Sequence, residues 1–358
     1  MALTALQNPK PDLAPVGLLP APKLKPKKNR YKKRTDLYQD VTDTVIRELE
    51  AGRAPWAQPW GRPDITTPLG LPSNGHTSRN YSGINILLLW GAAIETRRTT
   101  QVWLTYKQAL ALGGNVRKGE RGTTVCYADT FIPKAEQERA QTDGTEPQQI
   151  GFLKRYTVFN ADQCEGLPSE LYEGAMPLPE SETIPIAEKL IQATGADFRI
   201  GGDRAFYVPS KDFIQVPPQP AFFEQINYYR TCFHELGHWT GHTSRLERDM
   251  KGAKGSIPYA KEELVAEMTS AFVCAALSIV PTVRHTDYLG SWLRVLKDDK
   301  RAIFRAASLA SKAADYILAS QIPDSDPDLG NAVHQFLNLM ACSLVISVML
   351  MSPITRIK

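Results

Sequence analysis

The segment His234-Glu235-Leu236-Gly237-His238 constrains the fold of this 358-residue chain more than any other feature. On an α-helix, residues four apart lie on one face, one turn apart, so both imidazoles can reach a single metal ion. Imidazole is a preferred ligand of zinc, and a carboxylate beside the first histidine can take a proton from the water that the metal activates. The sequence therefore predicts a helix whose His234 and His238 bind Zn²⁺ and whose Glu235 is the general base.

The third metal ligand has two candidate sources. Gly241 follows the helix at the glycine of HExxHxxGxxH, but Ser244 stands where that pattern needs a histidine. His242 is close in sequence, yet on a continued helix it would lie about 12 Å along the axis from the first histidine. The other source is a second helix, on which Glu263 and Glu267 share a face at i, i+4.

We predict that Glu263 binds the metal, and that Glu267 accepts a hydrogen bond from the far nitrogen of a ligand histidine. The alternative is that both acids are ordinary solvated residues of an acid-rich first turn. A water activated by zinc and attacking a polarised carbonyl is the chemistry of peptide hydrolysis. Tyr259 and His242 are candidates for a second donor to the oxyanion. A metal that serves structure or partner recognition, without turnover, is the competing hypothesis.

Hydrophobic periodicity predicts an α+β chain of two domains, over 36–167 and 186–320, joined by a proline-rich linker over 168–185. In the first, we expect helices over 40–51, 84–93 and 105–112, strands over 125–128 and 155–159, and a polar exposed insertion over 134–149. The second is expected to be mainly helical, over 186–195, 228–239, 261–279 and 288–318. A hairpin over 205–216 would give it a small antiparallel sheet and an edge strand for a peptide.

Positive charge is concentrated near the beginning of the chain. Residues 1–34 hold nine Lys or Arg and one acid, with six prolines, which predicts a disordered basic arm over 1–35 that is attracted to phosphates. The alternative is a tail that only improves solubility.

Basic and aromatic residues also alternate within the first domain. From His76 to Ala128 there are seven Lys or Arg and two acids, with several Tyr and Trp between them. Cations that follow a phosphate backbone, interleaved with rings on which unpaired bases stack, are typical of single-stranded DNA binding. The competing interpretation is a core of aromatics under a solvated basic surface. The candidate contacts are Arg79, Tyr81, Trp103, Tyr106, Lys107, Arg117, Lys118 and Arg121.

Five cysteines, far apart and without CxxC, argue against a disulfide framework and predict a reducing, cytoplasmic location. The tail over 321–358 is apolar, and Phe336 to Ile354 lacks charge over a length that permits a membrane span. Asn338, serines and Pro353 favour a packed helix or an appended tail instead.

Longer stretches of the chain resemble the ArdC type of antirestriction protein. They are YYRTCFHELGHWTGHTSRLERD, YAKEELVAE and LKDDKRAIFRAASLASKAADYIL in the second half, and PWAQPW, SRNYSGINILLL, WLTYKQALALGGNVRKGERGT and YTVFNADQCEGL in the first. The resemblance covers about residues 36–320. It implies an N-terminal single-stranded DNA-binding domain and a C-terminal zincin-like metallopeptidase domain, in a protein that protects plasmid DNA from restriction during transfer. Part of the plasmid primase TraC is similar, although no primase signature is seen. The basic arm and the apolar tail depart from the family.

Overall fold

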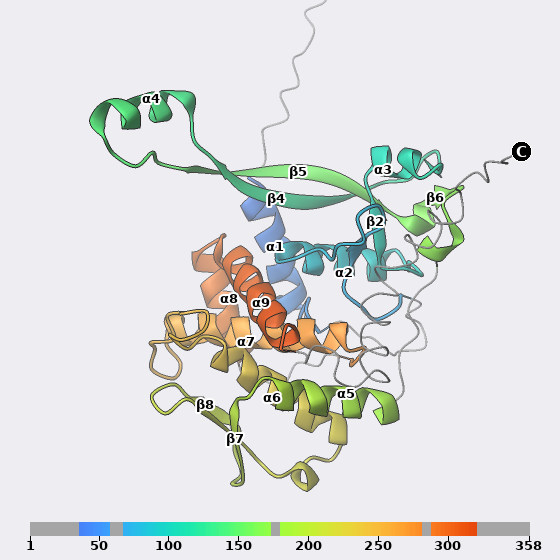
Figure 1. Cartoon of the computed structure of the whole chain (residues 1–358). Coiled ribbons are helices and arrows are strands. Elements are labelled where there is room, and N and C mark those ends of the chain that lie inside the picture. Colours follow the sequence, from blue (N-terminus) through green and yellow to red (C-terminus); the bar gives the residue numbers. More distant parts are fainter. Residues whose placement is uncertain (1–35, 58–66, 173–179, 281–287, 321–358) are drawn as a thin grey trace, which may run out of the picture. The chain divides into compact units, whose positions relative to one another are not determined.

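The structure, a computed structural model, describes residues 36–57, 67–172, 180–280 and 288–320. The predicted basic arm and the apolar tail lie outside these residues. From Leu37 onward the described residues form one compact unit that combines helices with sheets of four, two and three strands (Figure 1). The predicted α+β class is confirmed.

The first domain is built around a four-stranded sheet in the order β1-β2-β5-β4. Its strands are β1 (Ser73–Asn74), β2 (Val102–Leu104), β4 (Thr123–Phe131) and β5 (Ile150–Asn160). β1 pairs parallel with β2, and the other pairings are antiparallel. The two strands predicted from β-branched and aromatic residues are therefore present as one longer hairpin. The polar insertion between them carries helix α4 (Lys134–Asp143), which Figure 1 shows at the end of the hairpin.

Three helices accompany this sheet: α1 (Leu37–Glu50), α2 (Ile84–Glu95) and α3 (Tyr106–Ala111). Thr105 caps α3 in a reciprocal capping box with Gln108, as its sequence position predicted. Helix α2 packs against β4, where the Asn85 side-chain amide exchanges two 2.8 Å hydrogen bonds with the Cys126 backbone. This amide occupies the outer edge of β4 as a neighbouring strand would. A short pair, β3 (Asn115–Val116) and β6 (Cys164–Glu165), lies beyond α3 in sequence.

The second domain contains five helices among its described residues: α5 (Glu180–Ala193), α6 (Gln225–Trp239), α7 (Ile257–Ala276), α8 (Leu289–Asp298) and α9 (Ala302–Leu318). Helix α5 begins at Glu180 and contains Pro185, so the linker predicted over 168–185 is wrong at its C-terminal end. The periodic stretch over 288–318 is two helices, separated at Asp299, whose backbone is extended.

The second domain's sheet consists of β7 (Asp197–Ile200), β8 (Phe206–Val208) and β9 (Phe213–Val216), in the order β7-β9-β8. The predicted hairpin is β8–β9. The prediction of an antiparallel sheet is wrong, because β7 adds to β9 in parallel and makes the sheet mixed. β7 is only four residues long and largely exposed, and the polar–apolar alternation of its sequence does not show which strand it joins or in which direction.

Helix α7 is the centre of the core. It packs against α6, α8 and α9, and most of its residues are buried on every side. The first domain joins the same core: Trp90 of α2 meets Phe272 of α7 edge to face at 5.9 Å, and Trp56 meets Trp292 of α8 at 5.3 Å. Edge-to-face contacts at these distances are favourable aromatic packing. The metal-motif helix is thus supported by a core to which both domains contribute.

The membrane span considered for Phe336 to Ile354 falls outside the described residues. None of the helices that the structure describes combines the length and the hydrophobicity needed to cross a bilayer.

Candidate metal centre and nucleic-acid surface

The two predicted metal helices, α6 and α7, approach each other closely at Gly237. A methyl group in place of its hydrogen would lie 3.0 Å from the Ala266 Cα and 3.3 Å from Thr269 Cβ. Only a glycine fits this approach without separating the helices. Because Ala266 lies between Glu263 and Glu267, the close contact brings the HExxH face onto the carboxylates of α7.

His234, His238 and Glu263 offer ligand atoms that all lie within 4.8 Å of one another. The Nε2 atoms of the two histidines lie 3.6 and 3.5 Å from the Glu263 carboxylate oxygens. Ligand atoms about 2.1 Å from a tetrahedral metal are separated by about 3.4 Å, so this donor set fits one small divalent cation. Among the residues that the structure describes, this is the one such cluster found.

The acids of α7 are buried and are not solvated surface residues. Glu263 is 5% exposed and Glu267 2% exposed. Burial alone would raise the pKa of Glu263, but the close approach of His234 and the charges of both histidines outweigh it and lower the pKa to about 2. For His238 burial acts in the other direction and lowers the pKa, yet the hydrogen bond to Glu262 and the charges of Glu263, Glu262 and Glu235 outweigh it and raise the pKa to about 9. With its pKa raised, His238 would release a proton on binding a metal.

Outer partners hold both histidines. The Glu267 carboxylate faces His234 Nδ1 at 3.8 Å, on the side that the sequence predicted but farther than a hydrogen bond. Glu262, which sequence reasoning missed, lies 3.3 Å from His238 Nδ1. A carboxylate at the far nitrogen of a ligand histidine fixes the tautomer and the ring orientation. The adjacent acids Glu262 and Glu263 thus differ in role. Glu262 faces the far nitrogen of His238, whereas Glu263 faces the Nε2 atoms on the metal-binding side.

Arg248 fixes Glu262 in turn. Its guanidinium donates to both carboxylate oxygens, at 2.6 and 3.2 Å, and also to Gly237 O and Thr240 Oγ1. The Arg248 side chain is only 3% exposed, so this is a buried, bidentate ion pair. It comes from the loop after α6, fourteen residues before its partner, and no local spacing in the sequence points to it.

The other three candidate residues of the metal centre have different surroundings. Glu235, the predicted general base, is buried on α6 beside His234. The Tyr259 hydroxyl lies 3.1 Å from that of Tyr288; burial, this contact and the nearby Glu263 carboxylate raise the pKa of Tyr259, so the phenol stays protonated. His242 instead has its Nδ1 2.7 Å from the Ser244 hydroxyl and is not among the grouped metal donors.

Of the predicted DNA-contacting aromatics, one is corrected by the structure. Trp103 is 1% exposed and packs in a core cluster with Leu89, Val125 and Val158, so it cannot present a face to a base. It lies in a three-residue strand, too short to show which side chain points inward. Tyr81 is half-buried against the same cluster, whereas Tyr106 is 48% exposed.

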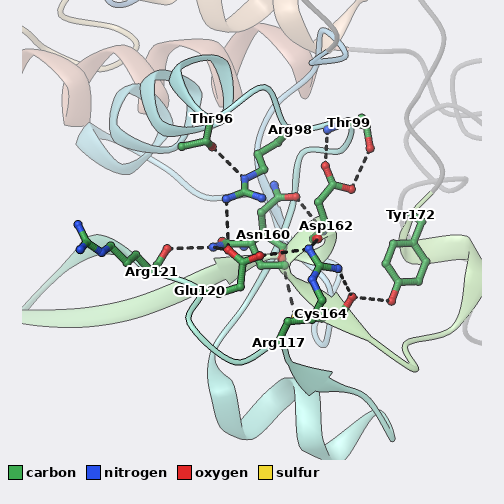
Figure 2. Close-up of polar contacts among 11 residues, drawn as sticks. Thr96, Arg98, Thr99, Arg117, Glu120, Arg121, Asn160, Asp162, Cys164 and Tyr172 are labelled. Carbon is green, nitrogen blue, oxygen red and sulfur yellow. Dashed lines mark hydrogen bonds and ion pairs between the residues drawn. The ribbon is translucent and has the colours of Figure 1, made fainter.

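The predicted arginines of the loop before β4 have different surroundings (Figure 2). Arg117 donates to the Asp162 and Cys164 carbonyl oxygens and pairs with Glu120 at 3.2 Å, so its guanidinium braces the fold. Arg121 enters this network through its backbone oxygen, and Figure 2 shows its side chain pointing away. The other predicted basic residues, Arg79, Lys107 and Lys118, are exposed.

This geometry is that of a zincin-like metal-binding domain, joined in the same chain to a small α+β domain. Comparison with known proteins agrees in both parts. A model of the N-terminal domain of anti-restriction factor ArdC matches residues 35–159, and a model of zincin-like metallopeptidases matches residues 185–309. The uncharacterized protein y4eC of Sinorhizobium fredii is 41% identical over 294 residues, covering 80% of this chain and 93% of the relative. The chain belongs to the ArdC family of antirestriction proteins.

Solved structures show the same two-domain architecture. The metal-free crystal structure of the antirestriction ArdC protein from plasmid R388 matches with a TM-score of 0.67 at 41% identity, covering 80% of this chain and 98% of that one. Its Mn(II)-bound structure matches with a TM-score of 0.66 at 40% identity and the same coverage. Two DNA primases TraC of Escherichia coli are each 40% identical over 79% of this chain, which spans 20% and 27% of their lengths.

Proposed function

We propose that this protein binds single-stranded DNA through its first domain and hydrolyses peptide bonds at a zinc site in its second, protecting plasmid DNA from restriction during transfer. The observation that carries the enzymatic half is the convergence of His234, His238 and Glu263 on one point, with Glu235 buried beside them. The DNA half is supported by the match to the ArdC N-terminal domain and by the similarity to the primases. The four described cysteines are buried thiols, which fits action in the reducing cytoplasm.

Zinc is the proposed metal because two imidazoles and one carboxylate are a donor set typical of catalytic zinc. The R388 relative binds Mn(II), which supports a divalent ion at this site. Manganese in general prefers sites with more oxygen ligands than this one offers. A bound zinc ion supplies Lewis acidity for attack of water on an amide carbonyl.

The protein's own residues do the rest. Glu235 accepts the proton of the attacking water and returns it to the leaving amine, while Tyr259, kept protonated by burial, can donate a hydrogen bond to a developing oxyanion. Glu262 orients the His238 imidazole, and the Glu267 carboxylate faces the far nitrogen of His234. The β8 strand is an edge of its sheet and can pair with an extended peptide.

The experiment for this half compares the zinc-loaded protein with its Glu235→Gln variant on a mixture of denatured protein substrates. We expect cleavage by the natural chain and at least a hundredfold less by the variant, with the metal content of both equal, since proton transfer contributes about 10²–10⁴-fold. Cleavage that survives the substitution would contradict the mechanism.

A metal centre without turnover is the second candidate, because the ligand side chains are so little exposed: His234 4%, Glu263 6% and His238 14%. In that case the natural chain binds zinc, is stabilised by it, and cleaves nothing. A third possibility, a protease whose first domain binds a protein, is favoured if the natural chain shows no affinity for DNA.

The DNA half is tested by fluorescence anisotropy with a single-stranded oligonucleotide and its duplex at two salt concentrations. We expect a preference for the single strand that weakens as salt rises, because bound phosphates release counterions. Equal or negligible binding to both would contradict it.

A further inference from the structure

Exposed aromatic side chains gather on one face of the β4–β5 hairpin. Tyr127 and Phe131 of β4 and Tyr156 of β5 are 47%, 49% and 45% exposed. The pairing register places Tyr127 opposite Lys154, and Val125 opposite Tyr156. Residues opposite each other in an antiparallel pair share a face, and residues two apart on a strand do too, so these rings lie on the same side.

The rings form a continuous row. Tyr156 lies 6.0 Å from Tyr127, Tyr127 lies 6.3 Å from Phe152, and Phe152 lies 5.8 Å from Phe131, between ring centroids. The row begins where Val125 and Val158 enter the core and continues towards α4. We call these four residues, Phe131, Phe152, Tyr127 and Tyr156, the aromatic row.

We propose that the aromatic row is a stacking surface for the unpaired bases of single-stranded DNA. This inference rests on the proposed DNA-binding function and assigns it a surface that the candidate contacts named from the sequence do not include. Core formation alone does not explain the row, because full burial of an aromatic stabilises a fold by roughly 1.5–3 kcal/mol, whereas Tyr127, Phe131 and Tyr156 leave nearly half of their surface in solvent.

The spacing of the rings favours single strands. Centroids about 6 Å apart are separated by nearly twice the ~3.4 Å between stacked bases along a duplex strand. Each ring can therefore meet one base of an extended strand, whereas a duplex covers its base faces within its own stack.

Positive charge lies beside the row. The Lys154 ammonium is 4.6 Å from the Phe152 ring centroid, on the same face, and is exposed. Lys118 and Arg121 are exposed in the loop that leads into β4. A strand whose bases stack on the rings can place its phosphates against these cations. Beyond the row, α4 carries the acids Glu136 and Asp143, both paired with Arg139. Negative charge there would repel phosphates, so the site would end before α4.

Cross-strand aromatic contacts also stabilise a hairpin, so the test must separate that role from DNA binding. The combined substitution Tyr127→Ile and Tyr156→Ile keeps β-forming residues while removing two stacking faces. Tyr127→Phe with Tyr156→Phe keeps the rings and removes only the hydroxyls. Thr124→Val changes the opposite face of the same hairpin, and Phe223→Ile removes a fully exposed ring of the second domain.

Anisotropy with a labelled single strand of about 20 nucleotides measures each full-length variant, and thermal melting checks its fold. We expect the Ile pair to lose about a hundredfold in affinity, about tenfold per ring, with an unchanged slope of affinity against salt. The Phe pair, Thr124→Val and Phe223→Ile should bind like the natural chain. If the Ile pair melts early, the two single Ile variants carry the test, since each retains three of the four rings.

If the natural chain binds no single strand, the proposed DNA function fails and this inference with it. If the natural chain binds and the Ile variants bind equally well, only the aromatic row is excluded, and its exposed face is left to a protein partner. Loss of binding in the Phe pair would also overturn the proposal, because stacking needs the ring and not the hydroxyl.

Discussion

The α6–α7 pair and the β4–β5 hairpin hold their functional side chains in opposite surroundings. At the metal centre, His234 and Glu263 are almost wholly buried, and each touches further charged groups. On the hairpin, Tyr127 and Tyr156 leave nearly half of their surface in solvent. Buried charges are stable only when they are paired, so binding and folding are coupled at the metal centre. On the hairpin, ligand binding and folding should be separable.

Arg248→Met is one of two substitutions from which we expect the largest effect. It leaves the Glu262 carboxylate buried without its bidentate partner, and we expect the free energy of unfolding of the metal-free protein to fall by about 3–5 kcal/mol, measured by urea denaturation. Arg199→Met is the control, because Arg199 pairs with Asp197 at 2.7 Å on the exposed surface and should cost less than about 1 kcal/mol. Equal costs for the two variants would remove the contrast between the regions.

Trp103→Ala tests whether this ring belongs to the core of the first domain. Removing this buried ring should lower the free energy of unfolding by about 3–5 kcal/mol, whereas Tyr106→Ala, at an exposed ring, should change it by about 0.5 kcal/mol or less. The same denaturation experiment measures both. A small cost at Trp103 would mean that the ring is available to a ligand after all.

Glu262→Gln should weaken zinc binding about 10–100-fold, because the carboxylate that orients His238 is lost while the shape of the side chain is retained. Competition with a chromophoric chelator measures the affinity. A parallel Glu188→Gln variant, on α5, should leave it unchanged. Unaltered affinity in Glu262→Gln would show that Arg248 and Glu262 serve the fold alone.

Gly237→Ala probes the distance between the metal helices. The added methyl must displace Ala266 by a few tenths of an ångström, so we expect zinc affinity to fall by roughly tenfold. Gly290→Ala is the matched control, since its added methyl meets nothing within 4 Å and should stabilise α8 by about 0.5–1 kcal/mol. An unchanged affinity in Gly237→Ala would contradict the role of close helix contact.

The smallest effect on stability is expected from Lys118→Ala combined with Arg121→Ala. Both side chains are exposed, so unfolding should change by about 0.5 kcal/mol or less. Affinity for single-stranded DNA should nevertheless fall, and the slope of log affinity against log salt should decrease in magnitude by about 1.4, at about 0.7 per phosphate contact. An unchanged slope would place the phosphate contacts elsewhere.

These two regions also differ in how far their sequence predicts them. The spacing of His234 and His238 is local, and it identifies a helix face and its chemistry together. Glu263 was predicted as the third ligand because one face of a second helix carries two acids. Glu262 and Arg248 were missed, because their pairing depends on where the loop after α6 returns, which no periodicity records.

In the first domain, aromatic residues lie both in the core and on the surface. Trp103 is in the core, in a strand of three residues that is too short for alternation to show this. Tyr127 is on the surface although it shares a face of β4 with the buried Val125, so alternation does not decide its burial either. The two strands of the β4–β5 hairpin were predicted in position but not in length, since the outer part of the hairpin is stabilised by cross-strand ring contacts instead of a core. Parallel pairing of β7 with β9 depends on tertiary contacts alone.

X-ray absorption at the zinc edge of the zinc-loaded protein tests the central claim most directly. We expect two imidazole nitrogens and carboxylate or water oxygen at about 2.0–2.2 Å from the zinc, with no sulfur. Glu263→Ala should lose an oxygen donor and keep both imidazoles. A sulfur neighbour at about 2.3 Å, or a third imidazole, would contradict the assignment of His234, His238 and Glu263 as the metal ligands.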